Sequence, residues 1–192
     1  MKYSILFFLV AAINCRAQTQ ETTTQTAVVT VPQEEVGLKD IHWQLREAIK
    51  MQLPATHTDE RNGQFFKKNY SISYQWSDEL KTFVIELPEK RLDPETEQVV
   101  SGSKYFIPFH AVETSGVRLV FSEDETRMGI SIPAKEGTTF VYHPFGNEPD
   151  EQQSTVLIGW YDRVQERTLG RLLEMFRQFF AKMEAEQKAH GE

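Results

Sequence analysis

The chain has 192 residues, of which 40% are hydrophobic and 26% charged, with a formal net charge of −7 and one cysteine. These values fit a single globular domain and exclude collagen-like, wholly disordered and disulfide-stapled proteins. Because surfaces that bind nucleic acids or anionic membranes need an excess of Lys and Arg, the acidic balance also argues against both partners.

The first 17 residues predict a signal peptide. A short basic start precedes an apolar run of about ten residues, Ser4–Ile13, which is too short to span a bilayer. Small side chains at Cys15 and Ala17 favour cleavage before Gln18. An alternative stays open, because bacterial lipoproteins are cleaved just before a cysteine that then carries lipid, and here that residue would be Cys15.

Cleavage before Gln18 would remove the only cysteine of the chain. An exported domain without disulfides is typical of bacterial envelope proteins and unusual for animal extracellular modules. We therefore expect a periplasmic or secreted bacterial protein, held at a membrane only if Cys15 is lipidated.

Residues 18–35 hold six Thr and four Gln, with no Lys or Arg, and predict a flexible linker. Within it, Ala27–Val31 indicates at most an added edge strand. The remaining residues, 36–192, are expected to form one globular α+β domain.

Hydrophobic periodicity predicts the elements of that domain. Apolar residues at helical spacing from Leu38 to Leu53 predict a helix that Pro54 ends, and a polar connection over 55–68 follows, with a turn at Asn62-Gly63. Apolar residues then alternate with polar ones in seven segments, with long loops expected at 88–103 and 143–153. The predicted strands are 69–76, 83–87, 105–109, 117–121, 128–132, 140–142 and 156–160.

The last segment predicts an amphipathic helix. Asp162 is placed to cap it, and seven large apolar residues follow at intervals of three and four. This stripe needs a sheet to cover it, so we expect an antiparallel seven-stranded curved sheet or partly open barrel, with an N-terminal helix and this C-terminal helix packed on the sheet. An open antiparallel sheet with both helices on one face is the alternative. The stripe comprises Leu169, Leu172, Leu173, Phe176, Phe179, Phe180 and Met183.

Seven antiparallel strands from Asn69 to Tyr161, followed by one helix from Asp162, resemble the pleckstrin-homology-like fold. The resemblance rests on the order of elements and covers about 120 residues. It implies a binding scaffold, because this fold is rarely catalytic.

No motif predicts a catalytic residue, a metal site or a cofactor. The chain has neither the G-x-S-x-G nor the S-x-x-K signature, and its five histidines are dispersed. The acidic segment Asp93–Glu97 fails the EF-hand pattern, because Gln98 stands where Gly is needed and Lys104 where Glu is needed.

Two sets of residues are candidates for contact with a partner. Phe65, Phe66, Phe106 and Phe145 lie off the clean alternation and would attract a partner if they formed one exposed patch. Arg163, Arg167 and Arg171 follow at four-residue spacing, opposite the apolar stripe, and would offer a docking strip to an acidic partner. For both sets, ordinary solvated surface is the alternative interpretation.

Three hypotheses of function remain. We expect a non-enzymatic exported interaction module of the bacterial envelope, which binds a protein or peptide at a sheet edge or at the loop-rich end. The alternatives are a small extracytoplasmic hydrolase, whose triad is assembled from distant residues, and a carbohydrate- or lipid-binding envelope protein.

Overall fold

The computed structural model describes residues 36–51, 55–58, 65–146 and 148–190. The expected signal peptide, the linker with its Ala27–Val31 strand, and the Asn62-Gly63 turn lie outside these ranges. Among the described residues, none of the helices combines the length and the apolar character needed to cross a membrane.

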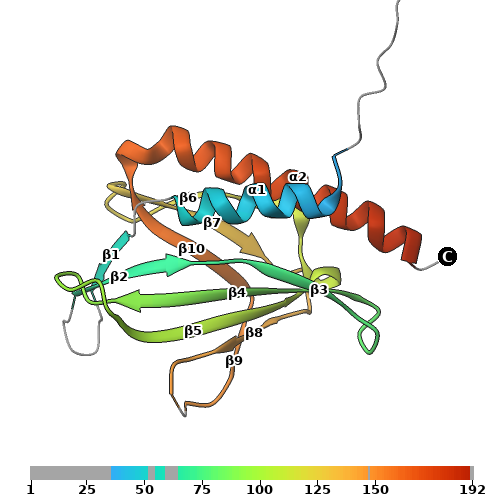
Figure 1. Ribbon diagram of the computed structural model, residues 1–192, viewed down its shortest axis with the longest axis horizontal. Coiled ribbons are helices and arrows are strands. Elements are labelled where there is room, and N and C mark those ends of the chain that lie inside the picture. Colours follow the sequence, from blue (N-terminus) through green and yellow to red (C-terminus); the bar gives the residue numbers. More distant parts are fainter. Residues whose placement is uncertain (1–35, 52–54, 59–64, 147, 191–192) are drawn as a thin grey trace, which may run out of the picture. The chain divides into compact units, whose positions relative to one another are not determined.

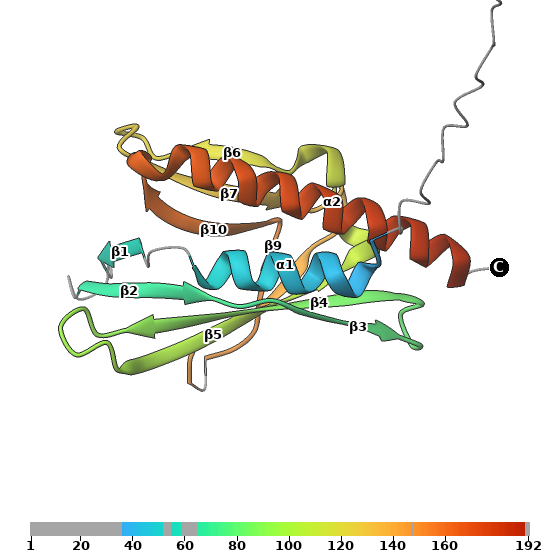
Figure 2. The same cartoon turned by 45° about the horizontal axis from the view of Figure 1, so that its top comes forward.

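The described part of the chain has the predicted α+β class, with antiparallel sheets, an N-terminal helix α1 (Leu38–Lys50) and a C-terminal helix α2 (Glu166–His190) (Figure 1). One sheet has seven strands in the order β1-β2-β4-β5-β8-β9, with β3 also paired to β4, and is not closed. The second has three strands in the order β10-β7-β6. Figure 2 shows α2 running beside β6 and β7 with α1 next to it, above the larger sheet. The strands are β1 (Ala55–Thr58), β2 (Phe65–Tyr70), β3 (Ser73–Ser77), β4 (Thr82–Leu92), β5 (Val99–Pro108), β6 (Arg118–Phe121), β7 (Arg127–Pro133), β8 (Phe140–His143), β9 (Glu151–Gln153) and β10 (Thr155–Asp162).

The predicted strand 69–76 is interrupted. Both β2 and β3 pair with β4, and the gap between them lies opposite Pro88. Ser71 donates its backbone N–H to the Pro88 carbonyl oxygen at 3.0 Å, but Pro88 has no N–H to return. The break therefore follows from the missing donor at Pro88.

Three predicted loops contain strands instead. Residues 88–103 form the end of β4 and the start of β5, so that only residues 93–98 turn, and there Asp93 accepts hydrogen bonds from the backbone and hydroxyl of Thr96. The polar connection 55–68 holds the β1–β2 pair, and 143–153 holds β9. Cross-strand hydrogen bonds, which the polar composition of these segments does not reveal, stabilise them as strands.

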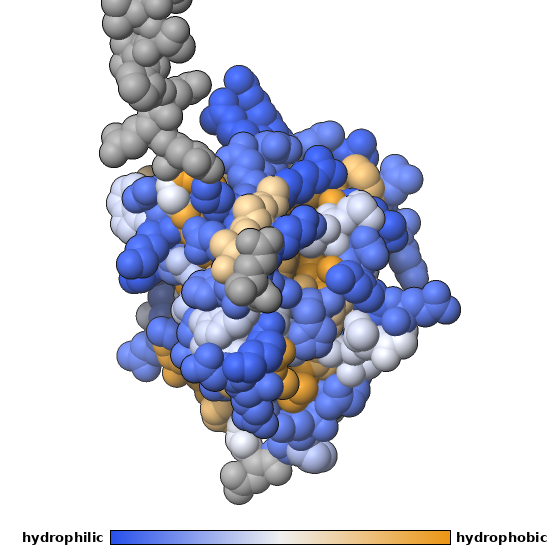
Figure 3. Space-filling view, turned by 90° about the vertical axis from the view of Figure 1, so that its right-hand side faces the viewer, coloured by the Kyte–Doolittle hydropathy of each residue, from blue (hydrophilic) through white to orange (hydrophobic). Residues whose placement is uncertain are grey.

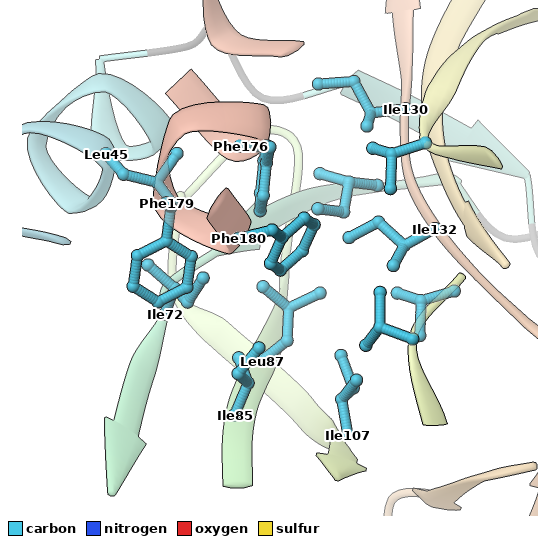
Figure 4. Close-up of a cluster of buried hydrophobic side chains, with 14 of the residues drawn as sticks. Leu45, Ile72, Ile85, Leu87, Ile107, Ile130, Ile132, Phe176, Phe179 and Phe180 are labelled. Atoms are coloured by element: carbon cyan, nitrogen blue, oxygen red, sulfur yellow. The ribbon is translucent and has the colours of Figure 1, made fainter. Parts of the chain in front are cut away.

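The buried stripe of α2 is confirmed, because all seven of its predicted residues are buried. Figure 4 shows Phe176, Phe179 and Phe180 meeting apolar side chains of α1, β4, β5 and β7. The end of the helix is fixed by polar and aromatic contacts: Thr82 Oγ1 donates to Gln187 Oε1 at 2.8 Å, and His190 stacks on Trp76 with 4.6 Å between ring centroids.

One buried hydrogen bond joins the two sheets. Tyr70 of β2 donates its hydroxyl to the Gly159 carbonyl of β10 at 3.1 Å, and burial raises the pKa of Tyr70 well above its usual value. The register of β10 against β7 shifts between Gly159 and Tyr161, so Tyr161 is buried and Trp160 is only half-buried. The alternation predicted the reverse for these two residues.

Candidate interaction surface

Strand β6 is the last strand of the three-stranded sheet and pairs with β7 on one side. Its burial decreases along the chain, from fully buried Val117 just before it, through half-buried Leu119, to Phe121, which is 45% exposed. The sequence predicted these three residues on one face of a strand, but the alternation does not tell which strand lies at an edge.

The chain between β10 and α2 adds to this exposed region. The 3-10 turn Arg163–Gln165 begins at Asp162, whose carboxylate accepts the backbone N–H of Val164 at 3.1 Å, as expected for a cap. Arg163 lies with its guanidinium carbon 5.4 Å from the centroid of the Phe121 ring. Val164 is 85% exposed.

Arg163 is also held by the tip of the β6–β7 hairpin. Its Nη1 donates to the Glu125 carbonyl oxygen at 3.4 Å and lies 3.8 Å from Glu125 Oε2. The turn itself is ordered by Asp124, which accepts hydrogen bonds from Ser122 and Thr126, and these bonds lower the pKa of Asp124 to about 2.

Arg167 and Arg171 are exposed on α2, away from its buried stripe, as the sequence predicted. From 163 to 171 the chain carries three Arg and one Glu, although its net charge is −7. Asp162 and the acids of the β6–β7 tip lie beside this segment, so the region carries charges of both signs, and Arg167 and Arg171 are its exposed cations on α2. We call these residues together the β6 surface, which comprises the strand Arg118–Phe121 and the exposed residues Arg163, Val164, Arg167 and Arg171.

The four candidate aromatic residues do not gather in one place. Phe106 contacts the His143 ring at 4.8 Å, with Lys104 Nζ 4.3 Å from its centroid, and Phe145 is 56% exposed in the turn after β8. Phe65 and Phe66 begin β2, and the next residue, Lys67, pairs with Leu92 at one end of β4. Phe106 instead pairs with Glu86, six residues earlier on β4. The two levels are about 20 Å apart along β4. The side chains of Phe65 and Phe66 lie outside the described part.

His143 and Asp150 form a contact of the kind that orients a general base in hydrolases. His143 Nδ1 lies within hydrogen-bonding distance of the Asp150 carboxylate. In the described ranges, His143 makes no hydrogen bond to a hydroxyl group, so the described contacts of the pair supply no nucleophile.

A buried carboxylate lies on the larger sheet. Glu89 is 2% exposed, and its oxygens lie 3.0 Å from Lys68 Nζ and 3.3 Å from Arg91 Nε. Its cross-strand neighbour Ser103 has a buried hydroxyl without a hydrogen-bond partner among the described residues. Burial, and next the Glu89 carboxylate, raise the pKa of Tyr105. Because two cations already neutralise Glu89, we interpret this cluster as an ion-pair network that stabilises the sheet.

Two further findings describe the rest of the surface. Within the described ranges, no three side chains of His, Cys, Asp or Glu are grouped so that they could hold a metal ion. The surface at the end of the domain where α2 finishes, seen in Figure 3, is mainly hydrophilic with small separate apolar areas.

Comparison with known proteins gives no match to a protein-family model, to a curated protein or to a solved structure. The resemblance to the pleckstrin-homology-like fold therefore stays a prediction.

Proposed function

We propose that this protein is a non-enzymatic, exported interaction module of the bacterial envelope, and that its β6 surface binds an acidic polypeptide. The observation that carries the proposal is the exposure of Phe121 and Val164 near Arg163 at the edge of a sheet, with Arg167 and Arg171 exposed on the first turns of α2. Exposed aromatic and Arg side chains are the residue types that contribute most to protein–protein binding.

Charge supports the choice of partner. Arg163 is paired with Glu125, whereas Arg167 and Arg171 expose guanidinium groups that can bind the carboxylates of a partner. Val164 offers an apolar contact to a partner. Its side chain is 85% exposed, so it contributes little to folding.

Selection from a library of linear peptides displayed on phage, against purified residues 18–192, tests the proposal. We expect enriched peptides to be acidic and to bind in a fluorescence polarisation assay. The double substitution Arg167→Glu with Arg171→Glu should weaken binding by about tenfold or more.

A matched control changes the net charge by the same amount elsewhere. Lys39 on α1 and Lys90 on β4 are both exposed, so Lys39→Glu with Lys90→Glu should leave peptide binding unchanged. An equal loss in the control, neutral or basic enriched peptides, or no enrichment would each contradict the proposal.

The contact between His143 and Asp150 keeps a small hydrolase as a second candidate. A fluorophosphonate probe labels an activated serine covalently. Labelling of the purified protein that disappears in His143→Ala would replace the binding proposal with this one, and we expect no labelling.

Export is proposed on the pattern of the first 17 residues. Mass spectrometry of the protein recovered from the envelope of a bacterial host should find an N-terminus at Gln18. An acylated N-terminal Cys15 would instead place the module on a membrane surface, and an intact Met1 would contradict export by cleavage.

A further inference from the structure

We infer that this protein forms a two-fold symmetric dimer through the outer edge of β3. The inference rests on the backbone groups that this edge directs away from the sheet and on the lack of charge along it. It goes beyond the proposed function, because β3 belongs to the larger sheet and the β6 surface to the smaller one.

The outer edge of β3 is open to a further strand. Among the described strands, β3 pairs only with β4. Ser71 donates its N–H to the Pro88 carbonyl, and the same register continues without a shift to the end of β3. Every second residue from Ser71 therefore bonds to β4, and the residues between them direct their N–H and C=O groups outward. These outward residues are Ile72, Tyr74 and Trp76.

Four outward backbone groups are available around Gln75. His42 of α1 donates its Nε2–H to the Ile72 carbonyl oxygen at 3.1 Å, so that acceptor is already occupied. In the described part of the chain, no residue bonds to the N–H or the C=O of Tyr74 and Trp76. Gln75 lies between these two residues, so the available part of the edge is centred on it.

A second copy of the chain matches this set of groups. If two β3 strands pair antiparallel about an axis through Gln75, Tyr74 lies opposite Trp76 of the second copy and exchanges two hydrogen bonds with it. Both copies then use all four groups. An axis through Tyr74 would place the occupied Ile72 carbonyl opposite Trp76, and an axis through Trp76 would pair Tyr74 with Asp78, beyond the end of β3.

The side chains of this edge are also self-complementary. From Asn69 to Ser77 the chain has no charged residue. About the axis through Gln75, the glutamines meet each other and Ser73 meets Ser77 on one face, and on the other face the aromatic residues of the two strands meet. Like charges therefore do not meet along the strand pair, although the chain has a net charge of −7.

Two other edge strands are protected in ways that β3 is not. Edge strands avoid pairing by short length or by charged side chains. Strand β6 begins with Arg118, and Arg177 occupies the Val117 carbonyl just before it, at 3.3 Å. Strand β9 has three residues and begins with Glu151. The five uncharged residues of β3 leave an edge that a second copy covers by strand pairing.

An exposed tryptophan lies on the side of α1 next to this edge. His42 reaches the outward carbonyl of Ile72, so its side of α1 lies beside the edge of β3. The next residue, Trp43, is about 100° further around the helix and is 63% exposed. A strand added to β3 would lie next to Trp43, so the dimer buries a residue type that contributes strongly to interfaces.

Charges placed at the axis test the dimer. Sedimentation of the purified protein should show a dimer with a dissociation constant on the order of micromolar, because five paired residues form a small interface. Gln75 meets itself in this dimer, so Gln75→Glu and Gln75→Lys should each weaken it by about tenfold or more. An equimolar mixture of the two variants should restore it, because Glu then meets Lys.

Matched controls carry the same charges elsewhere. Gln98 is exposed in the turn after β4, at the end opposite to the β3 pairing, so Gln98→Glu and Gln98→Lys should leave the dimer unchanged. Trp43→Ala should weaken it by about tenfold. Because all these positions are exposed, thermal melts should show every variant folded.

Hydrogen exchange locates the contact. The amides of Tyr74 and Trp76 should exchange more slowly in the dimer than in the diluted monomer, because a second strand accepts their hydrogen bonds. The amides of Ser73 and Gln75 point toward β4 and should change little.

Three results would overturn the inference. They are a monomer at every concentration up to about 1 mM, a dimer that both Gln75 variants retain, and a dimer that only one of the two charges weakens. Peptide binding at the β6 surface should be the same in both Gln75 variants and the original chain. Its absence contradicts the proposed function and leaves the dimer standing.

Discussion

The two sheets share one helix but use it differently. Against the larger sheet, the C-terminal half of α2 forms aromatic contacts, with Phe179 5.6 Å from Tyr74 and His190 4.6 Å from Trp76 between ring centroids. Beside the smaller sheet, the N-terminal half exposes Arg167 and Arg171 and holds the start of β6 through Arg177, and a Cβ atom at Gly170 would have nothing within 4 Å. A single helix thus buries its apolar stripe in both halves, while the arginines of its N-terminal half stay exposed.

Removing Phe179 should have the largest effect. It is fully buried, so Phe179→Ala should lower the free energy of unfolding by about 3–5 kcal/mol through lost burial and the cavity left behind. Chemical denaturation measures the loss. The neighbouring Gln178→Ala, at an exposed position, should change stability by less than about 0.5 kcal/mol. Similar values for the two variants would mean that this half of α2 is not packed on the larger sheet.

Cutting the link between the sheets should have a smaller effect. Tyr70→Phe leaves the buried Gly159 carbonyl without its partner and should cost about 1–3 kcal/mol in unfolding experiments. Tyr142→Phe is the control, because Tyr142 is half-buried and belongs to β8 of the larger sheet. An unchanged stability for Tyr70→Phe would show that the sheets are joined by packing only.

Alkaline pH should weaken the same link. Burial raises the pKa of Tyr70 above the usual 10.0, so the folded state favours the protonated hydroxyl. This contribution is complete below about pH 10 and decreases as pH rises above it, when the unfolded chain ionises first. Urea unfolding at increasing pH should show a shallower decline in Tyr70→Phe than in the original chain. Parallel declines would assign the pH dependence to other groups.

At Gly170, where α2 has open space beside it, a substitution should increase stability. Gly170→Ala meets no neighbouring atom and should raise the free energy of unfolding by about 1 kcal/mol. Destabilisation would show that the space beside α2 is filled in solution.

The smallest effect is expected at the hairpin that follows β6. Hydrogen bonds hold the pKa of Asp124 at about 2, so its contribution to folding is present above its usual 3.8 and is lost as pH falls toward 2. Asp124→Asn should remove this dependence from amide exchange at Thr126, and an unchanged dependence would exclude Asp124 as its source.

Clear periodicity made much of the fold predictable. Met128, Ile130 and Ile132 alternate as β7 does, and the apolar stripe of α2 is buried throughout. Lys90 and Arg91 gave no such signal, because they are strand residues through their cross-strand pairing with β2 and β5. The identity of an edge strand is likewise a property of the assembled sheet.

The candidate surface was therefore predicted only in part. The exposure of Arg167 and Arg171 follows from their helical spacing, whereas Arg163, which was expected on the same helix, lies in the 3-10 turn before α2 and is exposed there. Phe121 could not be found, since its sequence pattern equals that of a buried strand residue. Val164 carries a weak signal, as an apolar residue outside the stripe.

The proline in the middle of β4 also bears on how the chain avoids mispairing. The Pro88 carbonyl accepts the N–H of Ser71, and Pro88 has no N–H to donate. If the preceding strand shifted by one residue, the missing donor would lie opposite another residue, whose carbonyl would lose its cross-strand hydrogen bond. The same shift would turn Tyr70 and Ile72 away from the core. The missing N–H of Pro88 therefore favours one register of the preceding strand over the registers shifted by one residue.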